Sequence, residues 1–346
     1  LHLSLRRQRQ MCIRDRPRRV IVGDGAIREV RKIFDELGID RNSLVISDLN
    51  TYKVAGKRIE RNLDAESLII KGFMNDNIDE GLQKIRECEI GFVIGVGGGS
   101  VIDTAKICAF KAGVPYASVP TAASHDGITS PQATIPNKKP VSMRVHSPVA
   151  IIADTEIIRK APYRLLAAGC GDAISNYTAV LDWKLAKRER NEYFGDYAAS
   201  LSMMSAKIVM ENADKIRNDV SILVEALISS GVAMGIAGSS RPCSGAEHQF
   251  SHALDILCPG IALHGEQCGV GTIMMAYLHK ADWKRIRDVL NDLKAPVTAD
   301  DLGIEDKFII KALTMAHKIR DRYTILRDGL SMNDAIKLAK KTGVIN

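Results

Sequence analysis

The first half of the chain alternates short apolar runs with longer amphipathic segments, and this alternation constrains the fold more than any other feature. Apolar runs of strand length, separated by segments with helical periodicity, are typical of repeated strand-helix units. Such units form a parallel sheet with helices on both faces. We expect strands at Arg19–Val22, Ser43–Ser47, Ser67–Lys71, Ile90–Val96, Pro115–Val119 and over Val141–Ala153, with helices at Ala26–Leu37, Ile78–Cys88 and Val101–Ala112.

Past about Asp154 the alternation stops, and long helical patterns follow one another with short breaks at glycine or proline. Pro162 is suited to open the first of them, a helix through Leu181, because proline is tolerated at the first helical position. At 346 residues the chain is long enough for two domains. We predict a nucleotide-binding α/β domain over 17–160 and an all-α domain over 161–346. Further helices are expected around Leu201–Asn212, Ile222–Ala237, Ala246–Leu257, Glu266–Ala281 and Ile309–Ile319.

Positive charge is concentrated at one end of the chain. The formal net charge is +7, and residues 1–19 hold seven arginines and one aspartate, so they supply six of those charges. Lysine and arginine neutralise phosphates, but the rest of the chain is nearly neutral, so we expect no nucleic-acid partner. Residues 1–16 lack any helical or strand periodicity and are set aside as a non-native or disordered leader. A basic arm that binds nucleic acid is the alternative interpretation.

Cysteine usage and hydropathy indicate a cytoplasmic protein. The seven cysteines are odd in number and form no Cys-x-x-Cys pair, so neither a disulfide framework nor a zinc ribbon is indicated. Small buried thiols in a reducing compartment explain them better. The longest apolar stretch, Ile222–Gly238, is interrupted by Glu225, Ser229 and Ser230, which suits a buried helix rather than a membrane span. We expect a protein that is not embedded in a membrane.

A glycine-rich loop follows the fourth predicted strand. Residues 97–100 read Gly-Gly-Gly-Ser and lead directly into the helical pattern that begins at Val101. Glycine lets backbone amides approach an anion closely, and a helix N-terminus carries about half a positive charge. The loop therefore suits a pyrophosphate, although a tight strand-to-helix turn is an equally good reading of three glycines alone. It matches neither a phosphate-binding loop with Gly-Lys-Ser/Thr nor a strict Gly-x-Gly-x-x-Gly fingerprint.

Two further sequence features support a nucleotide site at the same edge of the sheet. The loop Thr121–Gly127 follows the next parallel strand and offers hydroxyls, amides and one carboxylate. Asp48 closes the second predicted strand, where it is placed to accept a hydrogen bond from an adenosine ribose. A solvated cap is the alternative role for Asp48.

Histidine is scarce, yet His248, His252 and His264 fall close together. His248 and His252 are four apart in a predicted helix, so both rings lie on one face. Asp172 lies in an otherwise small and apolar helix, where a lone carboxylate is costly unless a cation or hydrogen-bond donors neutralise it. Two imidazoles and a carboxylate with an open fourth position form a catalytic zinc arrangement. A histidine pair on a helix is, however, more often a surface or core feature than a ligand pair.

The combination of motifs resembles a known superfamily. Gly97–Ser100 with Asp103 and Lys106, the loop Pro120–Gly127 and the run Gly169–Asp172 are similar to glycerol dehydrogenases, iron-type alcohol dehydrogenases and 3-dehydroquinate synthases. Within it, the long motifs over 238–255 and 263–267 resemble the sn-glycerol-1-phosphate dehydrogenases. The resemblance covers essentially all of 17–346 and implies a Rossmann-like parallel-sheet domain followed by an all-α metal-binding domain.

Site residues follow from this resemblance position by position. It implies one zinc ion per chain, held by Asp172, His248 and His264, and substrate contacts at Asp126 and His252, with a second contact through Asp172. Asp126 and His252 are the implied catalytic residues. NAD(H) or NADP(H) is the implied cofactor, bound at Gly98, Gly99, Ser100, Val101, Ile102, Asp103, Thr121, Ala122, Ala123, Ser124 and Ser130.

The implied reaction is the reduction of dihydroxyacetone phosphate for the backbone of archaeal-type ether lipids. Zinc would polarise the ketone, His252 would relay a proton and Asp126 would orient the adjacent hydroxyl. A glycerol dehydrogenase acting on an unphosphorylated substrate and a 3-dehydroquinate synthase-like lyase are the alternatives. The substrate phosphate needs cations, for which Arg241, Lys138, Lys139 and Arg144 are candidates. The sequence leaves the oligomeric state open, a homo-oligomer included.

Overall fold

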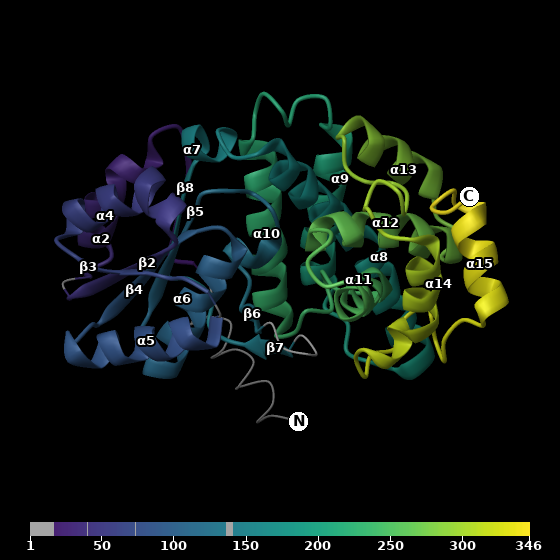
Figure 1. The fold of residues 1–346 in the computed structure, drawn as a ribbon, viewed down its shortest axis with the longest axis horizontal. Helices are drawn as coiled ribbons and strands as arrows, with labels where there is room; N and C mark the ends of the chain where they lie inside the picture. Colours follow the sequence, from purple (N-terminus) through teal and green to yellow (C-terminus); the bar gives the residue numbers. More distant parts are fainter. Residues whose placement is uncertain (1–16, 40, 73, 136–140) are drawn as a thin grey trace. The chain divides into compact units, whose positions relative to one another are not determined.

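The computed structural model describes residues 17–39, 41–72, 74–135 and 141–346. The chain folds as two compact units and passes from the first to the second between Pro162 and Tyr163 (Figure 1). The expected leader over 1–16 lies outside the described residues, as do two of the candidate phosphate contacts, Lys138 and Lys139.

The first unit is built on a parallel sheet, as the alternation predicts. Among the described residues the sheet has six strands in the order β1-β8-β5-β4-β2-β3, and every neighbouring pair is parallel. Val96 pairs with Val119 and Gly97 with Pro120, so the loops after β4 and β5 leave the sheet at one edge. The strands are β1 (Arg19–Gly23), β2 (Ser43–Ser47), β3 (Glu66–Ile69), β4 (Phe92–Gly97), β5 (Tyr116–Pro120) and β8 (Ala150–Asp154).

Both faces of this sheet are buried. In β2, Val45 packs into one core with Phe34 of α2 (Val30–Glu36), whereas Leu44 and Ile46 pack into the other core with Ile107 of α6 (Gly99–Ala112). Side chains alternate between the faces of a strand, so two-sided burial requires continuous apolar runs. Figure 1 shows α2 with α4 (Lys57–Leu63) on one face and α5 (Met74–Glu87) with α6 on the other.

The further strand expected over Val141–Ala153 is divided into two strands. β7 (Val141–Arg144) pairs with β6 (Gln132–Ile135) in a separate antiparallel ribbon, and only β8 joins the main sheet. Pro148 explains the interruption because it has no N–H for a ladder and restricts the residue before it. Several short helices were also not predicted. They are α3 (Leu49–Thr51), the π-helical turn η2 (Tyr52–Gly56), α4 and α7 (Thr155–Arg159).

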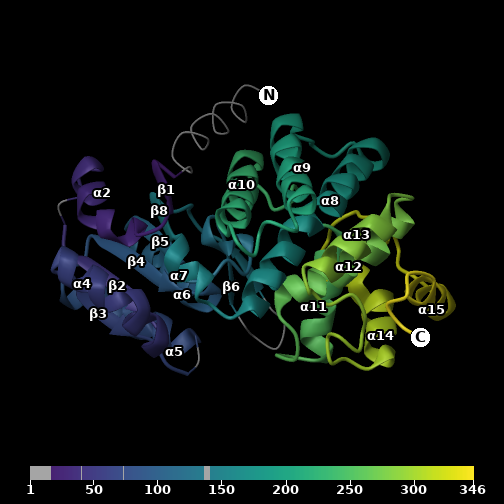
Figure 2. The same ribbon diagram turned by 90° about the horizontal axis from the view of Figure 1, so that it is seen from above.

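The second unit is helical. α8 (Tyr163–Arg190) packs against α9 (Asp196–Glu211) and α12 (His264–Leu278), and α12 also packs against α11 (Ala246–Leu257) (Figure 2). The remaining helices are α10 (Ser221–Ala237), α13 (Trp283–Asp292), α14 (Asp306–Met315) and α15 (Met332–Lys341). The helical patterns predicted α8 to α12 and α14, whereas α13 and α15 were not predicted.

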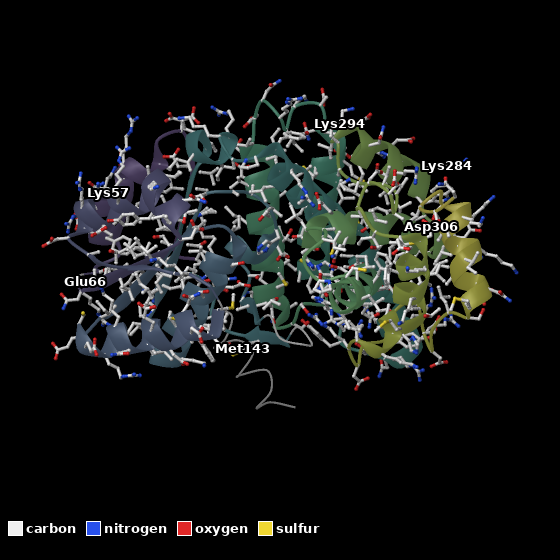
Figure 3. The ribbon with its side chains drawn as sticks, in the orientation of Figure 1. Lys57, Glu66, Met143, Lys284, Lys294 and Asp306 are labelled. Carbon is white, nitrogen blue, oxygen red and sulfur yellow. The ribbon has the colours of Figure 1, made fainter. Side chains whose placement is uncertain are left out.

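Charged side chains lie on the surface of each unit, among them the labelled Lys57, Glu66, Lys284 and Asp306 (Figure 3). The cysteines within the described ranges are free thiols. In that same part of the chain, no helix combines the length and the apolarity that a membrane crossing requires.

Candidate active site

The glycine loop joins β4 to α6. Gly98 is the N-cap of α6, in an extended conformation, and no side chain caps this helix end. A Cβ on Gly97 would lie 2.7 Å from Val101, and a Cβ on Gly99 would lie 2.0 Å from Nε2 of His125. A Cβ on Gly98 would meet nothing within 4 Å. Gly97 and Gly99 are therefore required by packing, whereas the space beside Gly98 is open over uncapped helix amides that suit a phosphate.

The loop after β5 lies beside the glycine loop. The N–H of Thr121 donates to the carbonyl of Gly97 over 3.1 Å. Nδ1 of His125 accepts from the N–H of Gly127 at 2.8 Å, and the ring fills the space next to Gly99 and Gly127. Burial lowers the pKa of His125, with Asp103 opposing the change. A neutral His125 thus fastens the two predicted cofactor loops together.

Most of the predicted cofactor residues are well buried here. The side chains of Val101 and Ile102 belong to the core, so only their backbone can face a ligand. Thr121, Ala122, Ala123 and Ser130 are buried, and Ser124 is half-buried. Ser100 is exposed beside Gly98 at the start of the helix.

Asp103 forms a buried ion pair with Lys106, whose side chain is inaccessible to solvent. Nζ of Lys106 donates to Oδ1 of Asp103 at 3.2 Å and to the carbonyl of Gln132 at 2.8 Å. Oδ2 of Asp103 accepts from the N–H of Thr134. Both carboxylate oxygens of Asp103 therefore bond to groups within the first unit, and the side chain holds the β6 segment against α6.

Asp126 begins the short 3-10 helix Asp126–Ile128, and its carbonyl accepts from the N–H groups of Thr129 and Ser130. Burial raises the pKa of its carboxyl to about 7, with Lys106 opposing the rise and Asp103 adding to it. A carboxyl with that pKa changes charge near neutrality, which suits a group that exchanges hydrogen bonds with a substrate hydroxyl.

Two of the metal-ligand candidates, Asp172 and His264, come together through close packing of α8 on α12, and His248 comes from α11, which packs against both helices. A Cβ on Gly171 would lie 2.3 Å from the carbonyl of Gly265, and one on Gly265 would lie 2.0 Å from the carbonyl of Ala168. These glycines let the two helix backbones touch. Asp172 follows Gly171 and His264 precedes Gly265, so the contact brings their side chains together.

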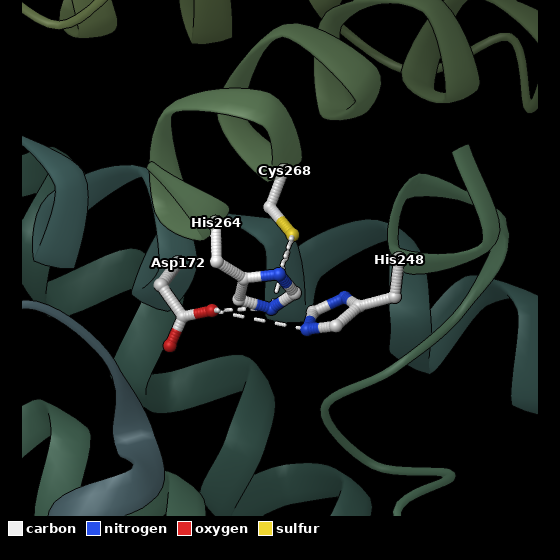
Figure 4. A group of neighbouring side chains, drawn as sticks. All are labelled: Asp172, His248, His264 and Cys268. Carbon is white, nitrogen blue, oxygen red and sulfur yellow. Dashed lines mark hydrogen bonds and ion pairs between the residues drawn. The ribbon is translucent and has the colours of Figure 1, made fainter. Parts of the chain in front are cut away.

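The ligand atoms of Asp172, His248, His264 and Cys268 all lie within 4.8 Å of one another (Figure 4). Oδ1 of Asp172 is 3.8 Å from Nε2 of His248 and 3.8 Å from Nε2 of His264. These distances are too long for hydrogen bonds. They suit donors sharing one ion, since ligands about 2.0–2.1 Å from a tetrahedral ion lie about 3.4 Å apart. The residues therefore fit a divalent metal, and Cys268 is a neighbour that the sequence did not predict.

Glu247 orients His248 by contacting Nδ1, the ring nitrogen opposite the one that faces Asp172. Oε1 of Glu247 lies 3.0 Å from Nδ1 of His248, and Oε2 accepts from Oγ1 of Thr178 at 2.7 Å. Burial raises the pKa of Glu247, while hydrogen bonds from Thr178 and from the N–H of Gly245 oppose the rise. Burial and then nearby positive groups hold the pKa of His248 well below its ordinary value. A neutral ring with its proton on Nδ1 presents Nε2 as a metal ligand.

His252 lies one helical turn after His248, and its ring stacks on His264 with centroids 5.6 Å apart. Nη2 of Arg320 donates to Nε2 of His252 at 3.0 Å. Nδ1 of His252 lies 3.6 Å from Oδ2 of Asp255. Arginine has no acceptor, so this contact makes Nε2 the acceptor and leaves the ring proton on Nδ1. Burial lowers the pKa of His252, which favours the neutral ring.

Comparison with known proteins assigns the chain to a family. Glycerol-1-phosphate dehydrogenase (NAD(P)+) of Methanosarcina mazei is 54% identical over 341 residues, covering 95% of this chain and 96% of the relative. The enzyme of the same name from Thermococcus sibiricus is 53% identical, covering 97% and 99%. The chain belongs to the glycerol-1-phosphate dehydrogenase family. It is thereby an oxidoreductase, and the resemblance predicted from its motifs is confirmed.

Broader comparisons show what else this glycerol-1-phosphate dehydrogenase family member is similar to. The family described as iron-containing alcohol dehydrogenase matches residues 21–162. The solved structure of a probable glycerol dehydrogenase from Sinorhizobium meliloti has a TM-score of 0.78 at 23% identity, covering 95% of this chain and 98% of that chain. Glycerol dehydrogenase from Schizosaccharomyces pombe has a TM-score of 0.78 at 20% identity, covering 96% and 94%. The predicted fold class is confirmed.

Asp48 of this family member acts as a helix cap. Its Oδ1 accepts from the N–H groups of Asn50 and Thr51, each at 2.8 Å, in a capping box with Thr51. This is the alternative role that the sequence left open. The ribose contact at Asp48 stays a prediction, and it would have to use the carboxylate oxygen that does not cap the helix.

The phosphate candidates differ in their surroundings. Arg241 is 8% exposed, and its guanidinium pairs with Glu192 and donates to the carbonyl of Tyr323. Arg144 is exposed on β7 of the first unit. Arg320 and Arg322, which lie beside His252 and the turn before α11, were not predicted. Their spacing in an irregular segment carries no periodic signal, so only the fold could reveal them.

Proposed function

We propose that this chain reduces dihydroxyacetone phosphate to sn-glycerol-1-phosphate, reversibly, with NADH or NADPH, and supplies the backbone of archaeal-type ether lipids. The observation that carries the proposal is the sequence identity between this chain and relatives of that name, 54% and 53% over nearly the whole chain. The arrangement of a carboxylate and two imidazoles in the second unit is consistent with it.

Zinc is the metal that we propose for the site. Asp172, His248 and His264 would hold it, because one carboxylate and two neutral imidazoles form a typical catalytic zinc donor set. When bound, zinc supplies Lewis-acid polarisation of the substrate ketone. The carboxylate of Asp172 and the imidazoles remain fixed by helix packing, and Glu247 keeps Nε2 of His248 unprotonated.

The first unit would bind the nicotinamide cofactor, which supplies the hydride. The backbone around Gly98 and the uncapped N-terminus of α6 would hold the pyrophosphate. Asp126 would accept a hydrogen bond from a substrate hydroxyl in its ionised form. These assignments follow the family motifs and the local geometry of each loop.

His252 is the proposed hydrogen-bonding partner of the substrate oxygen. A proton relay through its Nε2 requires Arg320 to release that atom, because the guanidinium now donates to it. Replacement of His252 by Asn tests the relay. Turnover and a pH profile equal to those of the wild type would exclude it.

One assay tests the proposed reaction. Oxidation of NADH and NADPH is followed with dihydroxyacetone phosphate and, separately, with dihydroxyacetone, and the configuration of the product is determined. We expect strong preference for the phosphorylated ketone and the sn-1 product. Equal or better rates with dihydroxyacetone would instead identify a glycerol dehydrogenase, and no reduction of either ketone would overturn the proposal. We further propose cytoplasmic localisation and a homo-oligomer, which fractionation and sedimentation can test.

A further inference from the structure

Two arginines converge on the turn that precedes α11. Arg320 donates from Nη2 to His252 at 3.0 Å and from Nη1 to Oγ of Ser244 at 3.4 Å. Arg322 donates from Nη2 to Oγ of Ser240 at 2.8 Å and from Nη1 to the carbonyl of Ser244. The two guanidinium groups and two serine hydroxyls therefore gather beside the His252 ring, which stacks on the metal-ligand candidate His264.

The segment that carries these arginines is fixed to α11. Nε2 of Gln249 donates to the carbonyls of Arg320 at 3.3 Å and Arg322 at 3.4 Å. Oγ1 of Thr324 donates to Oε1 of Gln249 at 3.0 Å. Gln249 follows His248 in α11, so the same helix positions the backbone of both arginines and the metal-ligand candidate His248. Positions fixed in this way cost little further ordering when a ligand binds.

Within the described residues, the arginine pair has no direct ion-pair partner. Across the described ranges, neither Arg320 nor Arg322 has a carboxylate oxygen within 4.0 Å, whereas Arg241 nearby pairs with Glu192. Burial lowers the pKa of Arg322 to about 10, the charges of Arg320 and Arg241 add to this effect, and the more distant carboxylates of Glu247 and Glu192 oppose it. The side chain therefore stays charged at neutral pH. Two partly buried positive charges side by side are costly unless an anion offsets them.

We propose that Arg320 and Arg322, with the hydroxyls of Ser240 and Ser244, form the subsite for the phosphate dianion of the substrate. The inference rests on the proposed function and extends it by naming the residues that select a phosphorylated ketone. Arginine forks match phosphate oxygens in pairs, and charge-assisted bonds are stronger than neutral ones. The position beside His252 puts the phosphate subsite next to the metal-ligand cluster within the second unit.

Kinetic comparison of two substrates tests the subsite in the zinc-loaded enzyme. Arg322→Gln should raise KM for dihydroxyacetone phosphate about 10- to 100-fold, the range expected for loss of charge-assisted hydrogen bonds. Rates with dihydroxyacetone should stay within about twofold, since that ketone has no phosphate. Arg327→Gln is the matched control, because Arg327 lies on the same stretch of chain but pairs with Glu189. Equal losses with both ketones, or no loss with the phosphorylated one, would overturn the inference.

A second measurement uses the unaltered enzyme and does not depend on how a variant folds. Phenylglyoxal modification of arginines, mapped by mass spectrometry, should be slowed at Arg320 and Arg322 by inorganic phosphate and more strongly by sn-glycerol-1-phosphate. Modification of Arg327 should not change. Protection by phosphate without reduction of dihydroxyacetone phosphate would retain the anion subsite but reject the proposed function. Reduction without protection by either compound would reject the subsite alone.

Discussion

Oε1 of Glu247 lies 3.0 Å from Nδ1 of His248 inside the second unit, and this contact selects the imidazole nitrogen that faces Asp172 and His264. Carboxylates that hold the far nitrogen of a ligand histidine fix its tautomer and raise its basicity. The short buried contacts of Glu247 with Thr178 and with the N–H of Gly245 keep the carboxylate in place.

Replacement of Glu247 by Gln should weaken zinc binding about 10- to 100-fold, the usual cost of losing such a partner. Zinc affinity can be measured by competition with a chromophoric chelator, which needs no turnover. Glu225→Gln, on an exposed position of α10, is the control and should bind zinc like the wild type. An unchanged affinity in Glu247→Gln would show that this carboxylate serves only the packing of α11.

Removal of the metal should abolish activity, and added Zn²⁺ should restore it. His264→Ala should lose the ion, because an open three-ligand site cannot spare one donor. Cys268→Ser tests whether the neighbouring thiol, whose Sγ lies 3.5 Å from Nε2 of His264, is itself a metal ligand. Zinc content measured by elemental analysis should fall in the first variant and stay near one per chain in the second. A metal-free preparation with full activity would reject the metal centre.

Asp126→Asn should lose up to about a hundredfold in kcat/KM, because a charge-assisted hydrogen bond contributes about 1.5–3 kcal/mol. The raised pKa of about 7 predicts that the wild-type kcat/KM increases as Asp126 ionises through that pH. The Asn variant should lack this step. Its zinc content and NADH affinity should barely change. Stoichiometric loss of zinc would make Asp126 a ligand, whereas full activity would reduce it to a loop cap.

The same carboxyl should influence stability in a defined pH range. Its folded pKa is raised, so its stabilising contribution is complete below the ordinary value of 3.8 and is lost as pH rises through about 7. The wild type should therefore lose stability relative to Asp126→Asn between these values. Urea unfolding of both proteins at several pH values measures the difference. A parallel pH dependence in the two proteins would contradict the perturbed ionisation.

Alanine at Gly98 and at Gly99 should produce opposite failures. Gly98→Ala has a negative φ and room for its Cβ, so the protein should fold with an unchanged Tm. The added Cβ would occupy the open space over the helix amides where the pyrophosphate is proposed to bind, so NADH binding should weaken at least about tenfold. Gly99→Ala would force its Cβ into His125 and should lower the Tm. Thermal melts and NADH fluorescence titration separate the two. Normal NADH affinity in Gly98→Ala would argue against pyrophosphate binding at this helix end.

The sequence alone predicted the repeated strand-helix units, the helical second half and the kinds of residue at the site. Those features can be predicted because they depend on neighbouring residues. A strand buried on both faces needs a continuous apolar run, as in Ser43–Ser47, and a loop rich in glycine has few structural uses. The ligand set at Asp172, His248 and His264 came from resemblance to a family. Glycine contacts between α8 and α12 bring Asp172 and His264 together, and α11, which packs against both helices, adds His248.

Only the tertiary structure decided which distant residues surround that cluster. Arg320 is 68 residues from His252, and Glu247 could have faced solvent in a helix of the same sequence. Arg322 likewise carries no periodic signal that marks it, whereas Cys268, four residues after His264, has the spacing of one helix face. Periodicity specifies which face of an element is buried, but the partner of a buried face depends on how the elements pack. The local pattern therefore determined the elements and the chemistry available to them, and helix packing decided which groups meet.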